Sequence, residues 1–136
     1  MILPLYLTEY LQWRRRFDDW LAVTAVSRDS ARQLNDKGNE AASLNNLGLA
    51  LVELRRFEEA LACYEQDIAI CRETGDLYGG GQTLDNLGSA YREMRQPGQA
   101  AARWLEAAAA MRDAGDHEEA ARLEQLAENA QIGQHP

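Results

Sequence analysis

The chain has 136 residues, of which 46% are hydrophobic and only three are proline, and its formal net charge is −8. This composition excludes a disordered chain and favours one helical, globular domain over residues 1–136, with a core large enough to fold by itself. The acidic balance argues against a nucleic-acid partner, and the lack of any run approaching ~20 apolar residues argues against a membrane span, so we expect a cytoplasmic protein.

Two stretches that read almost alike, 40 residues apart, divide the chain into units. Leu-Asn-Asn-Leu-Gly begins at Leu44 and Leu-Asp-Asn-Leu-Gly begins at Leu84, and a Gly-Asp pair recurs at 75–76 and 115–116. A fixed period of this length is typical of stacked supersecondary units. The sequence therefore predicts repeats at roughly residues 1–36, 37–76 and 77–116, followed by a remnant.

The first unit is predicted to be a divergent terminal repeat of two helices. Leu7, Leu11 and Phe17 keep the apolar spacing of the later units. Thr8 and Trp20 stand where the later units have a glycine and an alanine. The arginine run of the WRRRF stretch aligns with the turn of the second unit, so we expect it in a solvated hairpin turn rather than on nucleic acid.

The second and third units each carry two amphipathic helical stripes. In the second unit, apolar residues recur at spacings of three and four, first from Leu44 to Leu54 and then from Ala60 to Cys71. This is the pattern of helices with one buried face, and the third unit repeats it. We expect the breaks between helices at Arg55–Phe57 and at Arg95–Gly98, where a Pro-Gly pair is a stop signal.

Each Gly-Asp pair is expected to end one helix and to begin the next. The glycine can close a helix in the left-handed conformation, and the aspartate can cap the following helix. After the third unit, the acidic and Ala-rich stretch 117–131 predicts a single capping helix. Residues 132–136 are expected to be a frayed end.

A glycine follows a leucine of the buried stripe in each repeated phrase, at Gly48 and Gly88. Glycine in a helix interior costs about 1 kcal/mol relative to alanine, so it is expected where another helix must come close. The small residues Ala60 and Ala100 are the expected partners at these two crossings.

The leucines, glycines, alanines and aromatic residues of the two units occur in one fixed order. They are Leu44, Leu47, Gly48, Leu51, Ala60 and Tyr64 in the second unit, and Leu84, Leu87, Gly88, Tyr91, Ala100 and Trp104 in the third. This order resembles the tetratricopeptide repeat (TPR) family, in the long-repeat subtype of kinesin light chains and of the C-terminal arrays of bacterial nucleotide-dependent transcription regulators. The resemblance implies an all-α, right-handed superhelix of about three helix-turn-helix repeats plus a C-terminal capping helix. Asp67 departs from the family, which has a small apolar residue there.

The resemblance also implies a concave groove, lined by the first helix of each unit, that binds a protein segment. The residues that map to this groove are Asn45, Asn46, Leu49, Glu53, Asp85, Asn86, Ser89 and Arg92. An asparagine amide offers both a donor and an acceptor, so Asn46 and Asn86 are expected to hold the backbone of an extended ligand. The alternative is that these amides bond to water or to one another within the groove.

The predicted function is therefore protein or peptide binding, as the sensor or scaffold part of a larger bacterial regulator. The second unit and the final stretch are acidic, so a basic or neutral partner segment is expected rather than an acidic one. Among the groove residues only Arg92 is well placed to clamp a carboxylate. The alternative function is self-association, for example as a homodimer, through Tyr6, Tyr10, Trp13 and Trp20 of the first unit.

No catalytic site, metal site or cofactor is expected. The two histidines, His117 and His135, lie outside the repeated units. Cys63 and Cys71 are expected ~12 Å apart on one helix, which is too far for a disulfide. The glycine run at 78–83 lacks the strand and the Gly-Lys-Ser/Thr ending of a phosphate loop, so we expect a flexible turn and a frayed helix start there.

Overall fold

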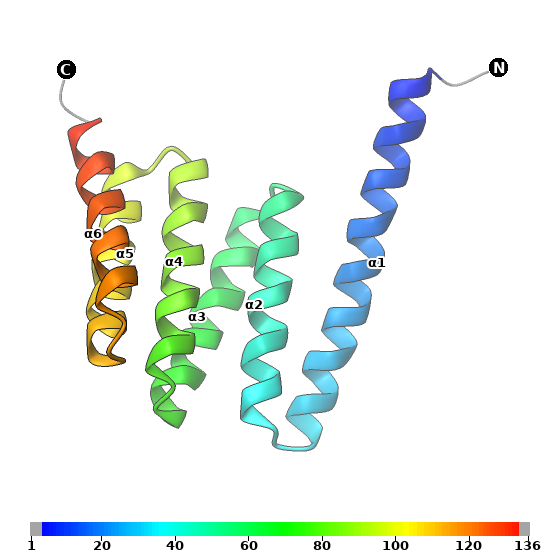
Figure 1. The fold of residues 1–136 in the computed structure, drawn as a ribbon. Coiled ribbons are helices and arrows are strands. Elements are labelled where there is room, and N and C mark those ends of the chain that lie inside the picture. Colours follow the sequence, from blue (N-terminus) through cyan, green and yellow to red (C-terminus); the bar gives the residue numbers. More distant parts are fainter. Residues whose placement is uncertain (1–3, 134–136) are drawn as a thin grey trace.

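The computed structural model describes residues 4–133, which form six α-helices joined by short turns (Figure 1). The helices are α1 (Leu5–Gln33), α2 (Lys37–Glu53), α3 (Phe57–Thr74), α4 (Leu77–Glu93), α5 (Pro97–Asp113) and α6 (His117–Ile132). The described part of the chain contains no strand, and the all-α fold expected from the sequence is confirmed. Most of the expected frayed end, residues 134–136, lies outside the described residues.

Each helix packs antiparallel against the next one along the chain (Figure 1). Helices α2, α4 and α6 form one layer, and α3 and α5 lie behind it in the view of Figure 1. Helix α2 also contacts α4 directly, which joins neighbouring hairpins within the first layer. The exposed side of the α2, α4 and α6 layer is called the inner face below.

The helix ends between units form as the sequence predicts. Gly75 and Gly115 have φ angles of 75° and 90°, in the left-handed region that glycine tolerates. The side chain of Asp76 accepts a hydrogen bond of 2.9 Å from the backbone N–H three residues later, and Asp116 does the same at 3.0 Å. These caps fix where α4 and α6 begin.

The turns inside the hairpins use arginine where glycine would be the usual choice. Arg55 and Arg95 have φ angles of 62° and 61°, which few residues other than glycine adopt. Helix α5 begins at Pro97, inside the expected break at Arg95–Gly98. Proline suits this first helical position because the N–H that it lacks would find no partner within the helix.

The two-helix expectation for the first unit is wrong, because α1 runs unbroken from Leu5 to Gln33. Arg15 and Arg16, which were expected in a turn, lie in the middle of this helix. No glycine or proline occurs between its ends, so nothing in the segment favours a break over continued helix. The described array therefore consists of α1, the pairs α2–α3 and α4–α5, and α6.

Aromatic rings occupy the positions that Cβ atoms would take at the two buried glycines. A Cβ atom at Gly48 would overlap the ring of Tyr64, and one at Gly88 would lie 2.7 Å from Cδ1 of Trp104. Tyr64 and Trp104 are fully buried, as are the two alanines one turn before them. The glycines therefore allow a large ring on α3 or α5 to rest against the backbone of the preceding helix.

The glycine run at 78–83 is helical and well packed, so the expectation of a flexible turn is wrong. It forms the first turns of α4, and Gly80 and Gly81 are buried. A Cβ atom at Gly81 would lie 2.9 Å from Cε of Met111, and one at Gly80 would lie 3.3 Å from Cβ of Cys71. The run lets α4 approach both α3 and α5.

Candidate functional site

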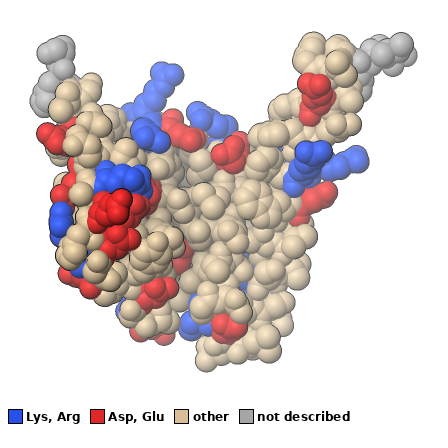
Figure 2. Space-filling model, in the orientation of Figure 1, with Lys and Arg blue, Asp and Glu red and all other residues tan. Residues whose placement is uncertain are grey.

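The residues that the sequence assigns to the groove lie on α2 and α4, and none of them is fully buried. Those partly buried are Asn45, Leu49, Asp85, Asn86 and Ser89, and those exposed are Asn46, Glu53 and Arg92. Figure 2 shows mainly uncharged side chains in the middle of the inner face, with acidic and basic side chains gathered over α6. The face therefore offers amide and hydroxyl groups at its centre and ion pairs at its edge.

The side chain of Asn86 bonds to another groove residue, Asn45. Its Nδ2 donates to Oδ1 of Asn45 at 2.8 Å, which links α4 to α2. Asn46, one residue away, is exposed and makes no side-chain hydrogen bond with the described residues. The two asparagines that the sequence pairs are thus in different states, since Asn86 is already bonded within the inner face and Asn46 is open to solvent.

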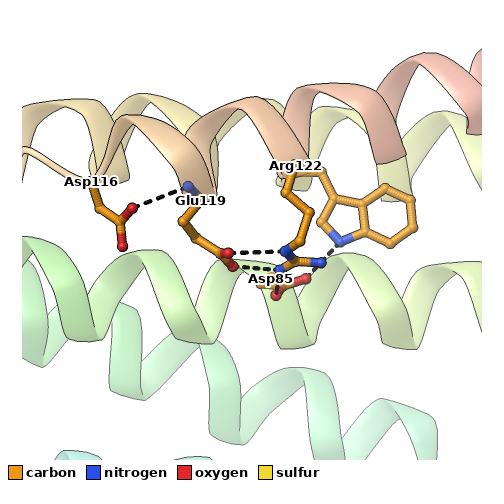
Figure 3. A network of polar contacts seen from close by, with 5 residues as sticks. Asp85, Asp116, Glu119 and Arg122 are labelled. Atoms are coloured by element: carbon orange, nitrogen blue, oxygen red, sulfur yellow. Dashed lines mark hydrogen bonds and ion pairs between the residues drawn. The ribbon is translucent and has the colours of Figure 1, made fainter.

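Asp85 is the centre of a polar network that ties α4 to α5 and α6 (Figure 3). Its Oδ1 accepts a hydrogen bond of 2.9 Å from the indole N–H of Trp104, and its Oδ2 accepts one of 2.7 Å from Arg122. Arg122 also bonds to Glu119, which raises the pKa of the guanidinium and lowers that of the Glu119 carboxyl. Sequence reasoning missed this network, because Arg122 lies in the predicted capping helix and not in a repeated unit.

Two charged residues near the end of α4, the groove residue Arg92 and its neighbour Glu93, are also engaged. The guanidinium of Arg92 lies 5.3 Å from the centre of the Trp104 ring, a cation–π contact. Next to it, Glu93 forms an ion pair of 3.5 Å with Arg55 of the preceding hairpin turn. Glu53 is exposed. A clamp for an acidic tail would need several basic groups, and among the predicted groove residues Arg92 alone is basic.

Two polar cavities lie side by side on the inner face. One, of about 230 Å³, lies between α2, α3 and α4, and its lining includes Asn46, Asp67 and Thr83. The other, of about 220 Å³, includes Asp85, Asn86 and Glu119 in its lining. Both are lined by Asn45 and Gln82, whose amides therefore stand between them.

Asp67 is the most deeply buried charged group at these cavities, with 2% of its surface exposed. It accepts a hydrogen bond of 2.5 Å from the hydroxyl of Thr83 and one of 3.4 Å from the thiol of Cys71. Burial raises the pKa of its carboxyl, and these two hydrogen bonds oppose the rise. The sequence marked Asp67 only as a departure from an apolar pattern, but that departure is the signal of a polar group inside the array.

Two larger cavities hold few of the groove residues assigned from the sequence. One of about 360 Å³ lies between α3, α4 and α5, and both apolar residues such as Ile68 and charged residues such as Arg72 line it. One of about 510 Å³ lies between α1 and α2 and includes Asn46 in its lining. The assigned asparagines and Asp85 come together at the two central cavities, which are therefore the candidate site.

A comparison with protein families identifies the repeats. The model of the tetratricopeptide repeat family matches residues 39–113, which is more than half of the chain and covers most of α2 through α5. The chain belongs to the tetratricopeptide repeat family. TPR domains are in general protein–protein interaction modules and are typically not catalytic. No curated protein matches this chain.

The cysteines of this TPR domain are poorly placed for nucleophilic chemistry. Cys63 and Cys71 are buried free thiols, and burial raises the pKa of Cys71 to about 12, so its nucleophilic thiolate is scarce near neutral pH. Within residues 4–133, no group of three or more His, Cys, Asp or Glu side chains is arranged to hold a metal ion. In the same range, no helix is long and apolar enough to cross a membrane.

Proposed function

We propose that this TPR domain binds an extended protein segment along its inner face. The observation that carries the proposal is the pair of adjacent polar cavities that share the amides of Asn45 and Gln82. An amide side chain can pair with both the N–H and the C=O of a peptide, so a row of amides can hold a backbone whatever its side chains. Asn46, which is exposed, lines the first of these cavities.

The charge of the first cavity supports a basic or neutral ligand. Asp67 and Asp76 line it, and no Lys or Arg does so among the described residues. A lysine or arginine side chain that entered the cavity would form charge-assisted hydrogen bonds with Asp67, which are stronger than neutral ones. An acidic segment would instead meet a buried carboxylate, and like charges at close range are costly.

The domain is further proposed to act as the sensor or scaffold part of a larger cytoplasmic regulator of bacterial origin. The resemblance of the two repeated phrases to the TPR arrays of such regulators supports this role. The reading frame upstream of Met1 tests it, because a nucleotide-binding domain there is the result expected, and an unrelated neighbour would contradict it.

Site-specific photo-crosslinking in cells tests the binding face. A photoreactive residue at position 46 or 82 should capture one partner in high yield, whereas the same residue at Gln99 should not, because Gln99 is exposed on α5 in the other layer. Equal capture at all three positions, or capture at Gln99 alone, would contradict binding at the inner face.

A further inference from the structure

Helix α1 extends well beyond the helix on which it packs. It has 29 residues, whereas α2 has 17, and the two run antiparallel from a short turn. At a rise of ~1.5 Å per residue, α1 outreaches α2 by roughly 18 Å. Figure 1 shows the N-terminal half of α1 standing clear of the rest of the molecule. Residues 5–16 are called the overhang below.

A stripe of aromatic side chains runs along the overhang and beyond it. Tyr6, Tyr10, Trp13, Phe17 and Trp20 recur at alternating spacings of four and three residues, the heptad spacing of helices that pack lengthwise. From Tyr10 onward, successive rings touch, with centroids 6.0, 4.7 and 5.8 Å apart.

The body of the protein covers this stripe at one end only. Thr24 and Ala31 continue the same heptad spacing and are buried, with 6% and 5% of their surfaces exposed. Tyr6 and Tyr10 keep 75% and 48% exposed, and Trp13 keeps 39%. An apolar surface of this extent on a soluble protein marks an interaction site.

We propose that the overhang of a second copy of this chain covers the stripe, running antiparallel about a two-fold axis. In the register that aligns the two stripes, Tyr6 faces the partner's Phe17 and Tyr10 faces the partner's Trp13. The two overhangs have equal length, so each occupies the space beyond the end of the other's α2. A parallel copy would meet α2, because α2 lies on the side of α1 that carries the stripe.

Charge identifies the occupant as a second copy, because the overhang is complementary to itself. Glu9 and Arg16 are seven residues apart and so lie on the same flank of the stripe. In the antiparallel register, each Glu9 faces the partner's Arg16, and two-fold symmetry makes this contact twice. Among the described residues, the ion pair of this part of α1 joins Arg14 to Asp18 at 3.7 Å and does not involve Glu9 or Arg16.

Sedimentation equilibrium over a range of concentrations tests the dimer. The wild-type chain is expected to reach about twice its mass of 15.2 kDa. Trp13→Ser should shift the chain to monomer. At dilutions where the wild type is itself monomeric, the helix content and melting temperature of the variant should stay near those of the wild type, because Trp13 lies beyond the reach of α2. A wild-type chain that stays monomeric at its highest soluble concentration would overturn the proposal, as would a Trp13→Ser variant that still dimerises.

Charge reversal tests the register. Glu9→Arg and Arg16→Glu should each raise the dimer dissociation constant roughly tenfold or more, because each places like charges together at two symmetric contacts. The double variant restores both pairs and should dimerise like the wild type. Arg15→Glu, on the opposite side of the helix, is the matched control and should have little effect. Failure of the double variant to recover would overturn the antiparallel arrangement, since a parallel pair would place Glu9 beside the partner's Arg14 instead.

Discussion

At Gly48 and Gly88, a single missing methyl group decides how closely two helices pack. The ring of Tyr64 or Trp104 occupies the space that a Cβ atom would need. The sequence predicted that both glycines mark close approaches. It did not point to the two rings, because the periodic pattern shows which side of a helix is buried but not which side chain of the facing helix lies against the glycine.

Gly88→Ala should destabilise the protein by roughly 1–3 kcal/mol, because its Cβ would lie 2.7 Å from a fully buried Trp104. Gly38→Ala is the matched control. It lies in exposed helix, where an added Cβ meets only Asp36 at 3.8 Å, and it should stabilise by up to about 1 kcal/mol. Urea unfolding measures both. Similar values for the two variants would show that the Trp104 ring can move aside without cost.

Asp67 predicts a specific dependence of stability on pH. Burial raises the pKa of the Asp67 carboxyl above its ordinary value of 3.8 in the folded state. The stability that the protonated carboxyl contributes is therefore fully present below pH 3.8, and it is lost as the pH rises through the raised pKa. The Asp67→Asn variant has no carboxyl to ionise at this position, so it does not lose stability in this way. The free energy of unfolding of the wild type should therefore fall relative to that of the variant from acidic to neutral pH. Parallel curves would contradict an ionising carboxyl at this position.

At the scale of the helices, the hairpin turns explain why the first unit was mispredicted. Arg15, Arg55 and Arg95 are spaced 40 residues apart, and the last two adopt positive φ in turns while the first lies inside α1. The residue type is the same at all three, so it carries no signal for a turn. The packing around it differs. Helices α3 and α5 fold back and bury Tyr64 and Trp104 against the helix that precedes each of them, whereas no helix precedes α1 among the described residues.

Asp85 ties α6 to α4 and α5, and the two ends of its network should differ in the free energy lost on mutation. Asp85→Ala leaves the N–H of buried Trp104 without its partner, which costs about 1–3 kcal/mol. Arg122→Ala removes a largely exposed ion pair and should cost about 1 kcal/mol or less. Chemical unfolding of both variants makes the comparison. Equal losses would mean that Asp85 acts only through the surface ion pair.

At the scale of the whole molecule, the fold follows from the sequence more fully than the site does. The helix periodicity and the Gly-Asp caps predicted α2 to α6, and the groove residues were assigned to the helices that carry them. A hydrogen bond of Asn86 within the groove was only the alternative to ligand binding, and its partner, Asn45, was not predicted. Neither was the hydrogen bond of the buried Asp67 to Thr83, because both bonds depend on contacts between repeats that no local pattern encodes. The resulting molecule keeps two surfaces apart, the inner face and the overhang of α1.

The affinity of the partner captured at the inner face tests the central claim most directly. Asn45→Ala combined with Asn46→Ala should weaken binding roughly tenfold to a thousandfold, because each lost hydrogen bond contributes about 0.5–1.5 kcal/mol and an unpaired desolvated group costs about 1–3 kcal/mol. Gln99→Ala should bind like the wild type, and calorimetric titration against all three chains makes the measurement. Wild-type affinity in the double variant, with its fold intact, would contradict recognition by the inner face.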